Sequence, residues 1–307
     1  MPFVHENELL EHARRKGYAV PAFFPFNFEF IAPIVEAAEE ERAPVILMQG
    51  PEFVKSFGEH VFTQAMLTAA HYAKVPVTLS VDHAFVTDDK AIPNATRDLA
   101  LGWNSVMLDG SLLPYEQNVS MTREMAVIAH NAGAACVGAL GEVRRFFPQA
   151  QNYAGAFEET FVVPPEIMTD PDQAAEFAAE TGVDTLAVSV GQYVRSLWDG
   201  ELPPFKRTGR LDFARLDAIL ERTGGVNLAL HGSSHVVEED LRECVNHGVN
   251  YIKVASEQAL IWANEVRRLV TADKNVMFPE DIQKPALAAV KESVRRYIRL
   301  FNASNQV

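Results

Sequence analysis

Short apolar runs recur along the chain, and most of them finish in Gly, Ser, Asp, His or Glu. Continuous apolar runs of this length are typical of parallel strands that are buried on both faces. Between them lie stretches with the 3.6-residue spacing of amphipathic helices, so predicted strands and helices alternate. The predicted strands are Val20–Phe23, Pro44–Gly50, Val77–His83, Ser105–Ser111, Ala135–Gly141, Thr185–Gly191, Asn227–Ser233 and Tyr251–Glu257.

Eight strand–helix units in 307 residues fit an α/β fold of the (β/α)8 TIM barrel type better than a doubly wound sheet. Because no Pro-rich or Ser/Gly-rich linker divides the chain, we expect one barrel domain over residues 1–307 with a closing C-terminal helical segment. The predicted helices are Glu6–Lys16, Ile31–Glu41, Phe62–Tyr72, Glu116–Asn131, Asp172–Thr181, Phe213–Glu221, Glu238–Asn246 and Pro279–Phe301.

One long stretch, residues 143–165, has neither a helical nor a strand period. Loops of this length in compact domains are usually lids or binding loops, with disorder as the other reading. On a barrel this loop would emerge at the rim where the chemistry lies, so we predict a lid.

The third predicted strand ends in Asp82 and His83, two titratable groups at the position where barrels keep their catalytic residues. On this strand alone, a capping Asp and a surface His would be the simpler interpretation. The recurrence of polar strand ends, including His231 after the seventh strand, favours a shared site. Lys253 lies inside the otherwise apolar eighth strand, where a lysine is costly to bury unless it is paired or deprotonated.

Composition narrows the range of partners and compartments. A formal charge of −14 argues against nucleic acid as a partner, because phosphate contacts require a basic surface. No apolar run is long enough to span a bilayer, and we expect no membrane association. The two cysteines, Cys136 and Cys244, form no metal or redox pattern, and the N-terminal residues lack the features of a signal peptide. We therefore expect a cytoplasmic protein.

Several short motifs spread over the chain resemble those of class II, metal-dependent ketose-bisphosphate aldolases, which include fructose- and tagatose-bisphosphate aldolases. The motifs are Gly17-Tyr-Ala-Val-Pro-Ala-Phe, Ala43-Pro-Val-Ile, Val81-Asp-His, Val106-Met-Leu-Asp-Gly-Ser, Leu186-Ala-Val, Leu230-His-Gly-Ser-Ser and Ile252-Lys-Val-Ala-Ser. The resemblance implies a TIM barrel, a homodimer or homotetramer, and a small-molecule substrate that is a phosphorylated sugar. It also implies cleavage between C3 and C4, with zinc or another divalent metal polarising the ketone.

The resemblance assigns roles to individual residues. Asp82 matches the acid that exchanges a proton with the C4 hydroxyl, and His83 and His231 match two metal-binding histidines. Glu159, or its neighbour Glu158, matches a mobile-loop glutamate that moves the C3 proton. The positions that match the phosphate-binding loops are Gly191, Gly232, Ser234 and Ser256.

Three departures from the family pattern converge on the metal site. The third metal-binding histidine is replaced by Val194, a strand-five carboxylate is replaced by Ala139, and a strand-eight asparagine is replaced by Lys253. The two remaining imidazoles, of His83 and His231, do not complete the three protein ligands that a catalytic zinc ion needs.

Three hypotheses account for these departures. In the first, Lys253 replaces the metal as electron sink by forming a Schiff base with a ketone, since a desolvated lysine can become nucleophilic. In the second, a metal is retained and Glu142 or His235 supplies the missing ligand, although residues an odd number apart on a strand face opposite ways. In the third, the barrel no longer cleaves a substrate and binds a phosphorylated or carbonyl ligand, with Lys253 paired to Glu257 or Asp109.

Overall fold

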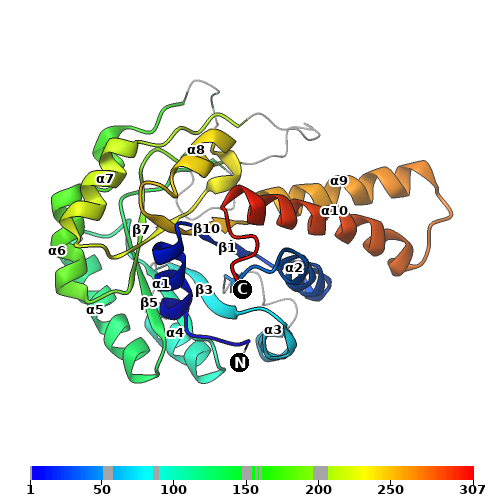
Figure 1. The fold of residues 1–307 in the computed structure, drawn as a ribbon, viewed down its shortest axis with the longest axis horizontal. Coiled ribbons are helices and arrows are strands. Elements are labelled where there is room, and N and C mark those ends of the chain that lie inside the picture. Colours follow the sequence, from blue (N-terminus) through cyan, green and yellow to red (C-terminus); the bar gives the residue numbers. More distant parts are fainter. Residues whose placement is uncertain are drawn as a thin grey trace.

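The chain folds into a closed barrel of parallel strands surrounded by helices (Figure 1). The computed structural model describes residues 2–50, 58–85, 90–146, 154–155, 158, 161–195 and 207–307. The barrel strands follow the order β1-β10-β9-β7-β5-β4-β3-β2, and each bonded pair is parallel, which confirms the predicted (β/α)8 fold. Their bounds are β1 Val20–Phe23, β2 Val45–Gln49, β3 Val77–Phe85, β4 Ser105–Asp109, β5 Ala135–Leu140, β7 Thr185–Val188, β9 Asn227–Leu230 and β10 Val249–Val254.

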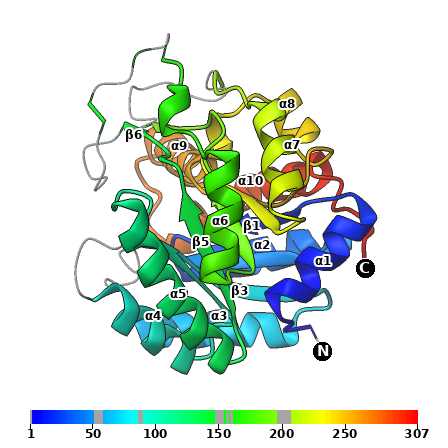
Figure 2. The ribbon, with the colours of Figure 1, turned by 90° about the vertical axis from the view of Figure 1, so that its left-hand side faces the viewer.

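Helices cover the outside of the barrel and bury their apolar faces against the strands (Figure 2). The helices are α1 Glu6–Lys16, α2 Phe28–Glu41, α3 Glu59–Tyr72, α4 Ala91–Ala100, α5 Tyr115–Asn131, α6 Pro171–Thr181, α7 Phe213–Arg222, α8 Glu238–Glu243, α9 Ser256–Ala272 and α10 Pro279–Leu300. Two short 3-10 helices, η1 Pro165–Ile167 and η2 Ser233–His235, follow loops on the rim.

The N-terminal segment closes the end of the barrel where the strands begin. The amide of Val77, the first residue of β3, donates to the carbonyl of Pro2 at 2.6 Å. The side-chain amide of Asn104 donates to the carbonyl of Val4 at 2.6 Å. Helix α1 then ends at Gly17, whose φ of 71° is the left-handed conformation that glycine adopts at helix ends. The opposite rim, where the strands end, is left for the loops.

The predicted strands start within two residues of the observed ones, but the last three end three residues too late, since β7 stops at Val188 and β9 at Leu230. The predicted eighth strand, Tyr251–Glu257, ends earlier: β10 stops at Val254 and Ser256 already begins α9. The prediction was wrong there: it placed Ser256 and Glu257 in the strand, whereas both residues lie in the first turn of α9. Helix α9 pairs with α10, and Figure 1 shows both helices projecting beyond the barrel.

A small second sheet lies above the rim. It consists of β6 (Arg145–Phe146) and β8 (Val194–Arg195), which pair in parallel with Arg145 opposite Val194. Within residues 143–165, Arg145 and Phe146 form a short strand that no period in the sequence indicated. No described helix has the length and the apolar character that a bilayer crossing requires.

Candidate active site

Asp82 and His83 lie at an irregularity in strand β3. The pairing of β3 with β4 shifts register between Val81 and Ala84, which is the mark of a β-bulge. His83 has φ of +47°, an uncommon conformation for a residue other than glycine. Consecutive residues of a regular strand face opposite ways, but the bulge lets both side chains reach one site. The bulge therefore builds a paired acid and imidazole from neighbouring positions.

Lys253 reaches the same site from strand β10. Its Nζ donates to Oδ1 of Asp82 at 2.8 Å, and only 3% of the lysine side chain is exposed. His231, which follows β9, places Nδ1 3.8 Å from the same carboxylate oxygen. Burial opposes ionisation of Asp82, but the ammonium group of Lys253 outweighs it and holds the pKa of the carboxyl well below its usual range. Asp82 is thus ionised, and the ends of β3, β9 and β10 bring the side chains of Asp82, His231 and Lys253 together.

The lysine amine is held in a desolvated environment. Nζ lies 3.2 Å from the sulfur of Met107 and 5.0 Å from the centre of the Tyr251 ring. The hydroxyl of Ser233 donates to the backbone carbonyl of Lys253 at 2.6 Å, which fixes the strand beneath it. The pairing of Lys253 with Glu257 or Asp109 is not found, since its carboxylate partner is Asp82.

His231 is buried beside this pair, and burial together with the nearby Lys253 lowers its pKa well below the usual range. The ring is therefore neutral. Its Nε2 is buried and has no hydrogen-bond partner among the described residues. This nitrogen is suited to form a hydrogen bond with a substrate oxygen, because a buried polar atom that forms no hydrogen bond is costly in free energy.

His83 is held by a different acid and by an arginine. Its Nδ1 lies 2.6 Å from Oδ2 of Asp109, at the end of β4, and Asp109 also accepts from the hydroxyl of Ser111 at 2.6 Å. Burial opposes ionisation of Asp109, but His83 and Arg145 hold its pKa well below the usual range. Nη2 of Arg145 lies 3.0 Å from Nε2 and 3.3 Å from Nδ1 of His83. These similar distances place the guanidinium against the ring rather than along one nitrogen lone pair.

The groups that could hold a metal ion are Asp82, His83 and His231, whose ligand atoms lie within 4.8 Å of one another. Two of the three already contact a cation, because Asp82 binds Lys253 and the His83 ring contacts Arg145. Nε2 of His231 is buried and has no hydrogen-bond partner among the described residues. Catalytic zinc needs three protein ligands and an open position, so this donor set does not fit it.

The replacement ligands considered from the sequence lie elsewhere. Glu142 forms an ion pair with Arg144 at 3.2 Å. His235 is buried and packs its ring parallel to that of Tyr193, and burial lowers its pKa to about 3. Neither joins the group formed by Asp82, His83 and His231 within the described part of the chain.

The predicted phosphate-binding residues lie on loops that follow neighbouring strands β7, β9 and β10. Gly191 has φ of +114°, and a Cβ there would lie 2.3 Å from the carbonyl oxygen of Arg210. Gly232 has φ of +66°, and a Cβ there would lie 3.0 Å from the carbonyl oxygen of Tyr193, closer than most such contacts. The hydroxyl of Ser234 accepts the amide of Glu257 at 3.3 Å, and Ser256 is the first residue of α9. These loops meet at one part of the rim, which is the geometry a phosphate cradle needs.

The catalytic glutamate proposed for the mobile loop is not placed. Glu159 lies outside the described residues, while its neighbour Glu158 is described and exposed. The predicted lid over residues 143–165 stays a prediction for the same reason.

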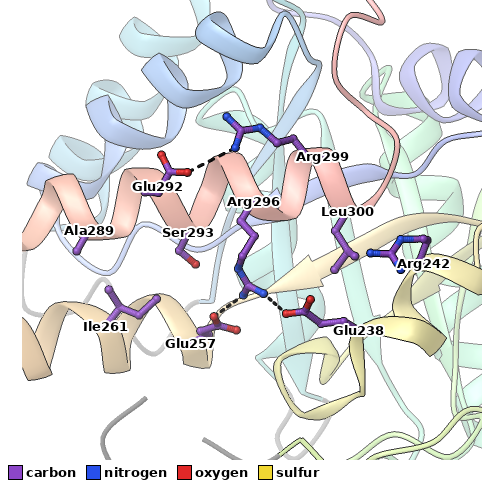
Figure 3. A pocket seen from close by; sticks show the side chains of 10 residues that line it. All are labelled: Glu238, Arg242, Glu257, Ile261, Ala289, Glu292, Ser293, Arg296, Arg299 and Leu300. Carbon is purple, nitrogen blue, oxygen red and sulfur yellow. Dashed lines mark hydrogen bonds and ion pairs between the residues drawn. The ribbon is translucent and has the colours of Figure 1, made fainter. Parts of the chain in front are cut away.

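A cavity of about 470 Å³ lies apart from this site, between α8, α9 and α10 (Figure 3). Arg296 bridges Glu238 and Glu257 across it, and the hydroxyl of Tyr297 donates to Glu257. Since the amide of the same Glu257 donates to Ser234, these ion pairs fix the start of α9 beneath the predicted phosphate loops.

Two residues of the site were not predicted from the sequence. Arg145 was not assigned to the site, and Asp109 was expected as a partner of Lys253 rather than of His83. Asp109 ends the strand next to β3, and acids at the ends of neighbouring parallel strands meet at one rim. That signal was present in the sequence. Arg145 lies in the stretch without a period, so the sequence offered no element on which to place it.

Comparisons with known proteins agree with this geometry. A family model described as "Fructose-bisphosphate aldolase class-II" matches residues 4–306. A fructose-bisphosphate aldolase from Staphylococcus epidermidis is 31% identical, with 100% of this chain and 99% of that protein covered. The D-tagatose-1,6-bisphosphate aldolase subunit GatY from Klebsiella oxytoca is 30% identical, with both chains fully covered.

Among solved structures, the YdjI aldolase from Escherichia coli K12 superposes with a TM-score of 0.76 at 26% identity, covering 99% of this chain and 98% of the other. The prediction of an aldolase-type lyase is confirmed at the level of the family. This chain belongs to the class II fructose-bisphosphate aldolase family.

Proposed function

We propose that this protein is an aldolase that cleaves and forms the C3–C4 bond of a phosphorylated ketose, with Lys253 replacing the divalent metal as electron sink. The observation that carries the proposal is the buried contact of 2.8 Å between Nζ of Lys253 and Oδ1 of Asp82. The family pattern has a metal beside this acid, and here an amine stands beside it. A ketone bound between Lys253 and the unengaged Nε2 of His231 would meet both groups.

The first step joins the substrate to the lysine. Asp82 takes a proton from the ammonium group of Lys253, and the freed amine attacks the C2 carbonyl carbon of the ketose. Asp82 returns this proton to the alkoxide oxygen and then carries a second proton from the carbinolamine nitrogen to the hydroxyl, which leaves as water, and a protonated Schiff base remains. The positive nitrogen then provides the electron sink that the metal provides in metal-dependent relatives.

The same residue, Asp82, then acts as the base in bond cleavage. Asp82, now a carboxylate, removes the proton of the C4 hydroxyl, and C4 becomes the carbonyl of the departing aldehyde. The electron pair of the C3–C4 bond passes into a C2–C3 double bond and gives an enamine. Protonation at C3, for which Glu159 is the proposed acid, and hydrolysis by water release the second product and restore the amine of Lys253.

A phosphorylated substrate is supported by the loops around Gly191, Gly232, Ser234 and Ser256. Backbone amides and hydroxyls clustered at strand ends bind phosphate through several hydrogen bonds at once. The relatives named above act on fructose and tagatose bisphosphates, so these two sugars head the list of substrates to test.

The alternative is a repurposed barrel that binds a phosphorylated or carbonyl ligand without cleaving it. The loss of a strand-five carboxylate at Ala139 and the closed ion pair of Asp82 with Lys253 are the observations that favour it. In that case the ion pair would be structural and no bond between lysine and ligand would form.

The proposal is tested by cleavage assays in chelator-treated buffer. Fructose and tagatose 1,6-bisphosphates and their monophosphates are supplied, and release of the triose products is measured. We expect turnover without added metal, reduced by about 10²–10³-fold or more in Lys253→Met and in Lys253→Arg, which keeps the charge but cannot form the Schiff base. Lys74→Met, at a side chain that is 84% exposed, is the matched control and should be unaffected.

Turnover that appears only after zinc is added would contradict the lysine mechanism. Binding of the sugars without cleavage by any tested form would favour the repurposed barrel. The lid over residues 143–165, a homodimeric or homotetrameric assembly and a cytoplasmic location complete the proposal as predictions.

A further inference from the structure

The charges at the site balance without a metal ion. Two acidic side chains, Asp82 and Asp109, lie at the site, and only 15% and 5% of these side chains are exposed. Lys253 contacts Asp82 at 2.8 Å, and the guanidinium of Arg145 faces His83, the residue that Asp109 holds. Two negative and two positive charges therefore share one buried group of side chains.

We propose that Arg145 and Lys253 together take the place of the divalent cation, with each supplying one of its two charges. Arg145 in β6 and Lys253 in β10 each carry one positive charge, so together they match the charge of one divalent metal ion. This inference rests on the proposed function, since it concerns the same site, but it adds Arg145 and a physical reason why the site would not hold a divalent ion. Arg145 acts through His83 and is a positioning residue.

The position of Arg145 supports this exchange. Arg145 and Val194 are register partners in the small sheet formed by β6 and β8. Val194 stands where the family pattern has its third metal-binding histidine. Arg145 is therefore the register partner of the position that lacks its metal-binding histidine. Its guanidinium contacts the ring of His83, which matches a metal-binding histidine that is retained.

The sheet holds the arginine firmly. The amide of Val194 donates to the carbonyl of Arg144 at 2.8 Å, and the amide of Ala154 donates to the carbonyl of Arg145 at 2.9 Å. Arg145 is only 9% exposed, so its charge is poorly screened by water. A divalent ion bound to the imidazole of His83 would lie beside this guanidinium and beside the ammonium of Lys253. Repulsion between like charges at such distances in a buried site is strong.

The test measures metal binding rather than catalysis. Cobalt(II) is titrated into the whole protein and followed by its visible absorption, with zinc displacing it as a check. The starting variant is Val194→His, which supplies a third imidazole. We expect it to bind cobalt weakly, because both protein cations remain.

Adding Arg145→Gln or Lys253→Asn to Val194→His should each raise cobalt affinity by at least ~10²-fold, since each removes one buried positive charge near the metal. Arg144→Gln is the matched control: it removes a charge from the adjacent residue, which pairs with Glu142 instead. It should change affinity by less than ~3-fold. Circular dichroism and thermal unfolding establish that each variant is folded.

Equal cobalt affinity in Val194→His with and without the two substitutions would overturn the proposal, as would an equal rise with Arg144→Gln. Tight stoichiometric zinc binding by the unaltered protein would overturn it as well. These outcomes are distinguishable from a failure of the proposed function, because the cobalt spectrum requires neither a substrate nor turnover.

Discussion

Lys253 and Asp82 are 171 residues apart in the chain, yet Nζ of the lysine lies 2.8 Å from Oδ1 of the aspartate in the interior of the barrel. The contact joins strand β10 to the bulge of β3 across the barrel, because β1 and β2 lie between these two strands on one side. A buried pair of this kind is strongly coupled, since removing one partner leaves the other charge without compensation.

The coupling predicts a non-additive effect on stability. Asp82→Asn and Lys253→Met should each lower the free energy of unfolding by about 3–5 kcal/mol. The double variant should lose clearly less than the sum of the two, because neither charge is then left alone. Urea denaturation of the four proteins measures the coupling. Additive losses would show that the pair contributes no interaction of its own.

Asp109 should matter to catalysis through His83. Asp109→Asn replaces the carboxylate that orients the ring with a neutral amide, and we expect kcat to fall by about 10–10²-fold with less effect on KM. The matched control is Asp217→Asn, which alters a His–Asp pair at the surface, where Asp217 Oδ1 lies 2.7 Å from Nδ1 of His247. An unchanged kcat in Asp109→Asn would remove His83 from the reaction.

Glu6 predicts a pH dependence of stability. Its carboxyl is fully buried, and burial raises its pKa from 4.5 to about 7, although Ser105 and Lys253 lower it. Between these values the unfolded chain has released the proton and the folded chain keeps it, so stability falls as pH rises from about 4.5 to 7. The loss is about 3 kcal/mol.

Urea denaturation of the wild type and of Glu6→Gln at pH 5, 6, 7 and 8 checks this. The variant cannot release a proton at this position, so its stability should lack the decline seen in the wild type. Parallel pH profiles for the two proteins would assign the decline to other groups.

The predicted phosphate loops can be tested by substrate choice. Ser256→Ala should raise KM for a phosphorylated ketose by about 10–10²-fold, the effect of one lost hydrogen bond to a charged group. It should leave KM unchanged for the sugar without phosphate. Ser304→Ala is the control, since the hydroxyl of Ser304 donates to Glu41 and belongs to none of the predicted phosphate loops. An equal rise with both sugars would place Ser256 outside the phosphate site.

Much of the fold could be predicted because barrel strands are buried on both faces. The runs at Val20–Phe23 and Val45–Met48 are apolar throughout, and the structure buries every residue of strands β1 and β2. The boundary between β10 and α9 was missed because Val254, Ala255 and Ser256 suit either element and no side chain caps the helix. Only the tertiary structure decides where the strand stops.

The site was predicted in part for the same reason. Asp82, His231 and Lys253 stand at the ends of apolar runs or inside them, so their strands place them. The bulge at His83 left no signal, since nothing in the local sequence marks a residue with positive φ. Arg145 was not predicted because its strand has two residues and depends on β8, which lies far along the chain.

The central claim is that Lys253 bonds covalently to the substrate ketone. The most direct measurement is reduction with sodium borohydride in the presence of a cleavable ketose phosphate, followed by mass spectrometry of the intact protein and of its peptides. The account predicts one stable adduct on the peptide that contains Lys253, absent from Lys253→Arg. Full turnover with Lys253 unmodified after reduction would contradict it.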